Sequence, residues 1–262
     1  MEQKLIPGVF NYCNRWCERC ALAHRCMLRV SELEMENEFD DPEDSLPDFS
    51  FEMDAEDSEE EKGSEEVIEF VPEFEVEEPS PDAMSALAKR REEMDRMLEQ
   101  NAPVKEAQMA GELIEIVLQR GNSLLAKETP VSTEGLTYHQ QQQVEGELHR
   151  IQNLLDILSW YRYMIQVKTM RAVSGKSEED EIDDPIQNDS NGSAKVIMIG
   201  AGHCLKAANG LLALIPAMEG ELLLLLSSLQ KYIKLMEDEF PNAMKFIRPG
   251  FDTLNITEDL GA

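Results

Sequence analysis

Residues 144–172 read VEGELHRIQNLLDILSWYRYMIQVKTMRA and carry apolar side chains at alternating spacings of four and three. The apolar positions are Val144, Leu148, Ile151, Leu155, Leu158, Ile165 and Ala172, and the repeat skips Arg162 and Thr169. This spacing predicts the a/d seam of an α-helix that packs against other helices. The helix is expected to begin after Gly135, to end at Gly175 and to be about 60 Å long.

The rest of the chain after residue 80 has the same helical periodicity. Ser80, Pro81 and Asp82 provide an N-cap, a proline in the first turn and an acidic residue near the positive end of a helix to about residue 100. Further helices are expected over residues 103–127, 193–214 and 216–239, and Phe246, Ile247 and Phe251 are expected to fold back onto them. The predicted fold class is all-α, an antiparallel helical bundle with one long helix.

The 262-residue chain has a formal charge of −29, and most of that charge lies in one segment. Residues 31–82 contain 24 acidic side chains and a single basic one, Lys62, interrupted by prolines. Such a segment cannot bury enough apolar surface to order itself, so residues 39–80 are predicted to form a disordered acidic linker. The linker separates a cysteine-rich module at residues 1–38 from the helical domain at residues 81–262, which has an acidic loop at 176–192.

The composition also bears on partners and compartment. A strongly negative chain repels phosphate backbones and anionic lipid, so non-specific binding to nucleic acid is not expected. There is no 18-residue apolar run and no apolar N-terminal signal, so we expect no membrane span and a cytoplasmic location. Thiols stay reduced in that compartment, and clustered cysteines there indicate metal or redox chemistry.

Residues 13–26 read CNRWCERCALAHRC and place four cysteines at the spacing C-x3-C-x2-C-x5-C. A segment this short has no interior in which to bury four thiols, so a bound metal is the expected reason for them. Basic side chains flank the cysteines and are expected to lower the thiol pKa values toward the thiolate form that binds metal. The candidate metal ligands are Cys13, Cys17, Cys20 and Cys26.

The identity of the metal stays open at this point. Structural zinc sites usually combine two cysteine pairs separated by a dozen or more residues, whereas all four cysteines here share one short loop. Iron–sulfur clusters often bind such compact runs. The candidates are therefore a 4Fe-4S cluster, zinc, or a set of redox-active thiols without metal.

Three partial resemblances accompany the cysteines. The spacing Cys17-x2-Cys20-x5-Cys26 resembles the end of the cluster loop in helix-hairpin-helix DNA glycosylases, although their first gap is six residues and Cys13 is only three residues from Cys17. Cys13-x3-Cys17-x2-Cys20 resembles the motif of radical S-adenosylmethionine enzymes, a family that needs βα units not predicted here. The segment around NRWCERC resembles the N-terminus of a family of uncharacterised bacterial proteins with helical bodies, and this resemblance implies no activity.

The helical domain contains few candidates for catalysis. No histidine follows an acidic residue by three positions, which excludes the usual di-iron site of helical bundles. A site formed by His139, His149 and His203 is conceivable, but exposed polar residues on helices explain them more simply. Cys204 is expected to be a buried thiol. An aromatic and basic group is expected to pack against neighbouring helices; it consists of Trp160, Tyr161, Tyr163, Arg162, Lys168 and Arg171.

These observations favour an accessory, non-enzymatic protein with a four-cysteine metal site, iron–sulfur or zinc, and a helical domain that binds a protein partner or self-associates through its a/d seam. One alternative is an iron–sulfur redox or metalloenzyme component. The other is an acidic regulator whose linker docks on a basic protein.

Overall fold

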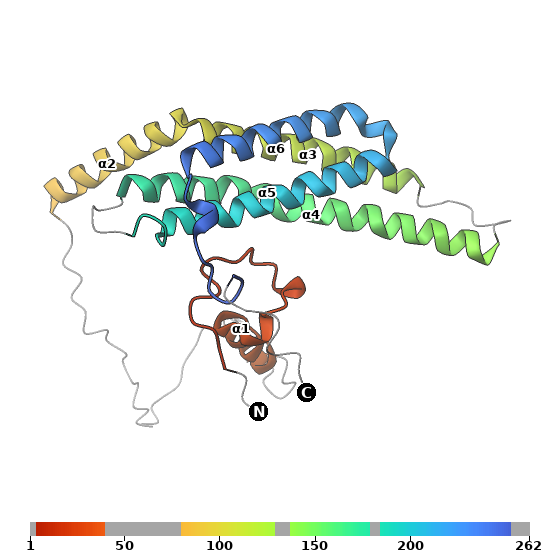
Figure 1. Cartoon of the computed structure of the whole chain (residues 1–262), viewed down its shortest axis with the longest axis horizontal. Helices are drawn as coiled ribbons and strands as arrows, with labels where there is room; N and C mark the ends of the chain where they lie inside the picture. The colour runs from red at the N-terminus through yellow and green to blue at the C-terminus, as the bar shows by residue number, and fades with distance from the viewer. Residues whose placement is uncertain (1–3, 40–79, 129–136, 179–183, 253–262) are drawn as a thin grey trace, which may run out of the picture.

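The computed structural model describes residues 4–39, 80–128, 137–178 and 184–252, and every regular element in these ranges is helical (Figure 1). The α-helices are α1 (Met27–Phe39), α2 (Pro81–Gln100), α3 (Ala102–Glu128), α4 (Tyr138–Glu178), α5 (Asp189–Leu214) and α6 (Glu219–Glu239). Short 3-10 turns are η1 (Cys17–Arg19), η2 (Ala23–Arg25), η3 (Pro216–Met218) and η4 (Ala243–Lys245). The predicted all-α body is confirmed. The predicted linker lies almost wholly outside the described residues, as does part of the acidic loop.

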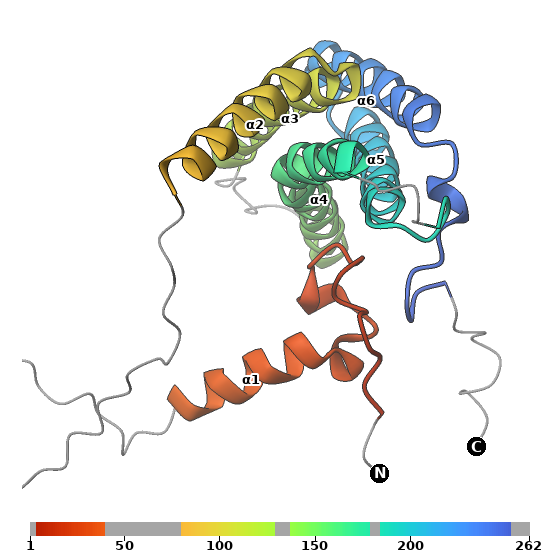
Figure 2. The same ribbon diagram turned by 90° about the vertical axis from the view of Figure 1, so that its left-hand side faces the viewer.

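Helices α3, α4, α5 and α6 form a four-helix bundle. α4 packs against α3 and α5, and α6 packs against the same two helices. Successive helices run in opposite directions (Figure 1), as predicted for an antiparallel bundle. α2 contacts α3 and α4 through its C-terminal turns, and its first turns extend beyond the bundle. Figure 2 shows α1 and the cysteine loop on one side of the bundle, with the loop next to α4.

The seam of α4 lies in the centre of the core. Its buried members are Ile151, Leu155, Leu158, Ile165 and Ala172. Val144 and Leu148 are half-buried because this end of α4 extends past its neighbours. Between residues 151 and 172 the seam is therefore covered by helices of the same chain, and the expectation that it serves self-association is wrong for this part.

The two positions that interrupt the seam have polar partners. The Thr169 hydroxyl is completely buried and donates to the Ile165 carbonyl oxygen at 2.5 Å, and it also lies 2.6 Å from the Tyr232 hydroxyl of α6. The half-buried Arg162 forms an ion pair with Glu115 of α3. Both skips thus mark polar contacts between helices, which satisfy groups that burial would otherwise destabilise.

Two helix boundaries differ from their predicted places. Gly175 does not end α4; it lies inside the helix, where a Cβ atom would stand 2.7 Å from Ser190 Oγ of α5, so the glycine permits a close helix contact. α5 starts at Asp189 because the Asn188 side chain accepts a hydrogen bond from the Asn191 amide at 2.8 Å and caps the helix. The cap of α2 at Ser80 is confirmed, since Ser80 Oγ accepts from the Ala83 amide at 3.2 Å.

α5 is the most apolar helix of the bundle. Among the described helices, it alone is long and apolar enough to cross a membrane by length and composition. Half of its most apolar window is buried within the protein, where it packs between α4 and α6.

The burial of the α4 seam predicts how far truncating one of its side chains lowers the free energy of unfolding. Leu155 is 1% exposed and packs against Gly121 of α3, so Leu155→Ala leaves a cavity and should lower the free energy of unfolding by about 2–5 kcal/mol. Leu224→Ala removes the same atoms from a side chain that is 62% exposed and should change the free energy by less than about 0.5 kcal/mol. Urea denaturation followed by circular dichroism measures both. Equal effects of the two substitutions would contradict the described core.

Candidate metal centre

The cysteine loop is built from two short turns that follow each other in the chain. Cys17 begins η1, and the Cys20 amide closes that turn on the Cys17 carbonyl oxygen at 3.2 Å. The Cys26 amide closes η2 on the Ala23 carbonyl oxygen at 3.2 Å, and α1 begins at the next residue. The spacings x2 and x5 therefore place Cys17 at the start of a turn, and Cys20 and Cys26 each directly after one.

The first part of the loop is held by hydrogen bonds around Cys13. Arg15 has a left-handed backbone, with φ of 57°, which is uncommon for a residue other than glycine. In this conformation the Arg15 amide donates to Cys13 Sγ at 3.4 Å, and Asn14 Oδ1 accepts from the Trp16 amide at 3.2 Å. Amide donors of this kind orient metal-ligand sulfurs and tune the bound metal.

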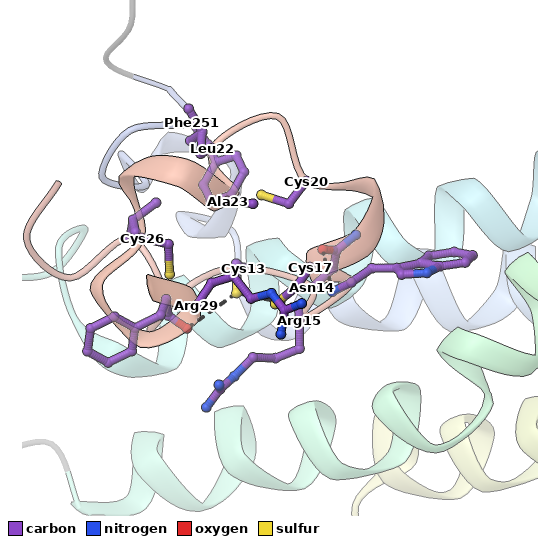
Figure 3. A pocket seen from close by; sticks show the side chains of 13 residues that line it. Cys13, Asn14, Arg15, Cys17, Cys20, Leu22, Ala23, Cys26, Arg29 and Phe251 are labelled. Atoms are coloured by element: carbon purple, nitrogen blue, oxygen red, sulfur yellow. Dashed lines mark hydrogen bonds between the residues drawn. The ribbon is translucent and has the colours of Figure 1, made fainter. Parts of the chain in front are cut away.

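The four cysteines line one cavity. The space that they line is partly open to solvent. Figure 3 shows the side chains of Cys13, Cys17, Cys20 and Cys26 around this space. Arg15, Arg29, Phe10, Leu22 and Phe251 are among the other lining residues. The structure therefore brings all four predicted ligands to one place.

The thiols are spread around the cavity and do not close on a single point. Among the described residues, no group of three histidine, cysteine, aspartate or glutamate side chains is placed to hold one metal ion. No disulfide joins the cysteines, and Cys26 is buried while the other three are half-buried.

The pKa values of two thiols are shifted in the direction opposite to the expected one. Burial raises the pKa of the Cys13 thiol, and the hydrogen bond and charge of Arg15 offset only part of this effect. Burial also raises the pKa of Cys17, together with the charge of Glu32. The expectation that the flanking cations lower these pKa values is therefore wrong for both thiols. A metal must displace their protons, so metal binding is favoured by rising pH.

Other groups bond several of the flanking cations. Arg19 bonds Asn153 and Asp156 of α4, Arg25 bonds the Lys4 carbonyl oxygen, and Arg29 bonds Glu32 and Glu36 within α1. The contacts of Arg19 and Arg25 help to hold the loop in place.

The loop docks on α4 through an aromatic stack. The rings of Trp16 and Trp160 are stacked with centroids 4.9 Å apart and an interplanar angle of 14°. Trp160 Nε1 donates to the Asn14 carbonyl oxygen at 2.8 Å, and Asn14 Nδ2 donates to the Tyr161 hydroxyl at 2.9 Å. The guanidinium carbon of Arg19 lies over the Trp16 ring, 3.9 Å from its centroid. These contacts fix residues 14–19, and with them Cys17, on the bundle.

The C-terminal segment covers the opposite side of the cavity. Phe251 lines the cavity, and Gly250 has a left-handed φ of 77° that lets the chain pass close to Ile6 and Leu22. Phe246 is buried and its ring meets Tyr12 edge-on at 4.6 Å. The predicted fold-back is thus right for Phe246. It is wrong for Ile247, which is 50% exposed, and for Phe251, which packs on the cysteine loop rather than on the helices.

An ion pair anchors this segment to α5. Lys195 Nζ donates to Asp252 Oδ2 at 2.8 Å and to the Phe246 carbonyl oxygen at 2.6 Å, and the Arg248 guanidinium also bonds Asp252. Burial by itself raises the pKa of Asp252, but the hydrogen bonds and charges of Arg248 and Lys195 outweigh it and hold that pKa well below its usual range.

The other predicted candidates do not form a site within the described residues. His139 and His149 are exposed on α4, and His203 stacks on Tyr161 at 5.8 Å, so the three do not converge. Cys204 is fully buried as predicted, and burial raises its pKa to about 12, which leaves it an inert thiol.

The aromatic and basic group of α4 divides between several surroundings. Tyr161 is buried in the bundle as predicted, and the partly buried Trp160 packs both against the core of the bundle and on the cysteine loop. Tyr163 is 63% exposed, with the Arg162 guanidinium over its ring at 4.2 Å.

The sequence did not reveal the parts of the centre that are distant from the cysteines. Phe251, Trp160 and Lys195 reach it only through the fold, and α1 was not predicted either. The only sequence feature that points to the stack is that the chain contains just two tryptophans, Trp16 and Trp160.

No family model, curated protein or solved structure matches this chain. The resemblance of the NRWCERC segment to uncharacterised bacterial proteins, and the partial resemblances of the cysteine spacing, therefore stay predictions. Any functional conclusion rests on the geometry of the cysteine loop.

The stack should be measurable as a coupling between its two rings. A double-mutant cycle of Trp16→Leu and Trp160→Leu should give an interaction energy of about 0.5–1.5 kcal/mol in the free energy of unfolding. Either substitution alone already removes the stack, so the double variant should lose less than the sum of the two single effects. The control combines Trp16→Leu with Tyr163→Leu, which removes an exposed aromatic ring from the same helix as Trp160. The effects of these two substitutions on the free energy of unfolding should be additive. An additive Trp16 and Trp160 pair would contradict the described docking.

The anchor of the C-terminal segment should depend on pH. Asp252 has a lower pKa in the folded chain than its unfolded value of about 3.9, so its contribution is complete above that pH and is lost as pH falls toward the folded pKa. Asp252→Asn should lower the free energy of unfolding by about 1–3 kcal/mol at neutral pH. The gap to the unsubstituted protein should shrink below about pH 4. Urea titrations over a pH series test this, with the exposed Asp238→Asn as control; a gap that does not change with pH would refute the ion pair.

Proposed function

We propose that this chain is an accessory iron–sulfur protein in which Cys13, Cys17, Cys20 and Cys26 hold one 4Fe-4S cluster against a helical bundle. The observation that carries the proposal is the cavity, which all four thiols line together. A cluster offers four separate iron atoms as attachment points, so its ligands stand apart from one another.

Zinc is the weaker candidate for the same four thiols. Structural zinc sites usually combine two cysteine pairs that lie far apart in the chain. All four thiols here share one short loop, and iron–sulfur clusters often bind such compact runs.

The role we propose is electron storage or transfer rather than substrate activation. Four cysteines would occupy one position on each iron, which leaves no iron open to a substrate. When bound, such a cluster accepts or donates single electrons. Cys13, Cys17 and Cys20 are half-buried, so the cluster would lie close enough to the surface to exchange electrons with a partner.

The helical bundle would serve as the platform that holds the loop and binds a protein partner. Exposed apolar side chains on α4, Tyr163 and Val167, each 63% exposed, support an interaction role for this helix outside its buried seam. We retain a cytoplasmic location as part of the proposal. Docking of the acidic linker on a basic protein concerns residues 39–80 and stays a separate prediction.

Anaerobic reconstitution with iron and sulfide tests the proposal. The full-length chain should become brown, hold one cluster and lose its visible absorption on reduction with dithionite. Cys13→Ala, Cys17→Ala and Cys20→Ala should each reduce the retained iron by more than about tenfold, since mutating even an outer-shell partner of a metal site costs 10–100-fold in affinity. Cys204→Ala, which removes a thiol far from the loop, should retain the full amount of iron.

Two results would overturn the proposal. One is a colourless chain that binds zinc alone under these conditions, and the other is equal iron retention in the loop variants and in Cys204→Ala. Circular dichroism of each variant ensures that the comparison is made between folded chains.

A further inference from the structure

The C-terminal half of α4 carries an unusual excess of positive charge for so acidic a protein. Residues 157–177 contain no acidic side chain, and their basic residues are Arg162, Lys168, Arg171 and Lys176. Carboxylates of other helices or of the α5 N-terminus pair with three of them, through the ion pairs Arg162–Glu115, Arg171–Asp189 and Lys176–Glu239. Lys168 forms no ion pair with any residue that the structure describes.

Lys168 lies on the face of α4 that the cysteine loop covers. Tyr161, two helical turns before it, bonds Asn14 of the loop. Arg171, one turn after it, holds Asp189 at 2.8 and 2.9 Å, and Asp189 accepts a hydrogen bond from the Tyr12 hydroxyl at 3.2 Å. Lys168 therefore lies on α4 between Tyr161 and Arg171, the two residues through which residues 12–14 are anchored. This anchored stretch contains Cys13.

Charged groups of both signs lie around this amine. Lys168 is half-buried, and burial together with the charge of Arg171 lowers its pKa, with a further contribution from Arg15. The charge of a Cys13 thiolate acts on Lys168 in the opposite direction, as does that of Asp189. A half-buried ammonium without an ion-pair partner is unfavourable unless an anion comes close to it.

We propose that Lys168 is the counter-ion that α4 supplies to the cluster, so that the redox state of the cluster and the docking of the cysteine loop on the bundle depend on each other. This inference rests on the proposed function. Four thiolates around the iron–sulfur core leave a net negative charge, and one electron from a one-electron donor makes that charge more negative without breaking or forming a bond. A fixed cation stabilises the reduced form more than the oxidised form, because the attraction grows with the charge.

By linkage, the same preference acts on the loop. If Lys168 favours the reduced cluster, then reduction must favour the docked loop by the same factor. Lys168 is accordingly a positioning residue, and its charge, rather than any contact with a substrate, is what it contributes.

The test is a redox titration of the reconstituted full-length chain, with dithionite as reductant and the visible absorption as readout. Lys168→Met and Lys168→Gln remove the charge in two different ways, and Lys168→Arg keeps it. Lys176→Met is the matched control, because it removes a lysine from the same helix two turns farther from Tyr161, where it pairs with Glu239.

At the potential that half-reduces the unsubstituted protein, we expect the ratio of reduced to oxidised cluster to fall about tenfold in Lys168→Met and Lys168→Gln, which is about 59 mV for a one-electron couple. Lys168→Arg should restore the ratio to within about threefold, and Lys176→Met should leave it unchanged. If Lys168→Met and Lys168→Gln hold a full cluster and match Lys176→Met, the counter-ion is refuted while the proposed cluster stands. If the unsubstituted chain holds no cluster, both proposals are wrong.

Discussion

The stacking of Trp16 on Trp160 is the contact on which the organisation of this protein depends. Residues 4–26 contain only two 3-10 turns, and a segment of this length cannot bury a core of its own. The stack, with the hydrogen bonds of Asn14 to Trp160 and Tyr161, replaces that missing core by a surface of α4. Because Trp16 directly precedes Cys17 and lines the same cavity, fixing the ring also fixes the side of the cavity where that thiol lies.

The charge distribution acquires a structural meaning from this docking. The chain as a whole is strongly acidic, yet the cysteine loop and the half of α4 beneath it are basic. Most cations of the loop are engaged by carboxylates of α1 and α4 and by backbone oxygens, so they contribute to holding the loop more than to lowering thiol pKa values. Burial instead has the largest effect on the thiols and raises the pKa values of Cys13 and Cys17.

The helical body could be predicted from the sequence because its signals are local. The seam from Ile151 to Ala172 and the cap at Ser80 depend on residues within a few positions of one another, and the structure places both as expected. Gly175 shows where local signals mislead, since a glycine that reads as a helix end serves a contact with Ser190 on another helix.

The four cysteines could also be singled out from their spacing, but the rest of the centre could not. Phe251 and Trp160 approach the cavity from positions far away in the chain, and only the packing of the bundle brings them there. The pKa shifts of the thiols depend on the same packing, because burial is a property of the folded chain and not of neighbouring residues in the sequence.

Mössbauer spectroscopy of the protein, reconstituted anaerobically with iron-57, distinguishes a four-iron cluster from single metal ions. We expect the signature of one cluster of four electronically coupled irons in an all-sulfur environment per chain, and the loss of that signature when Cys13 and Cys17 are both replaced by alanine. Isolated iron, or a chain that keeps zinc in place of iron, would contradict it.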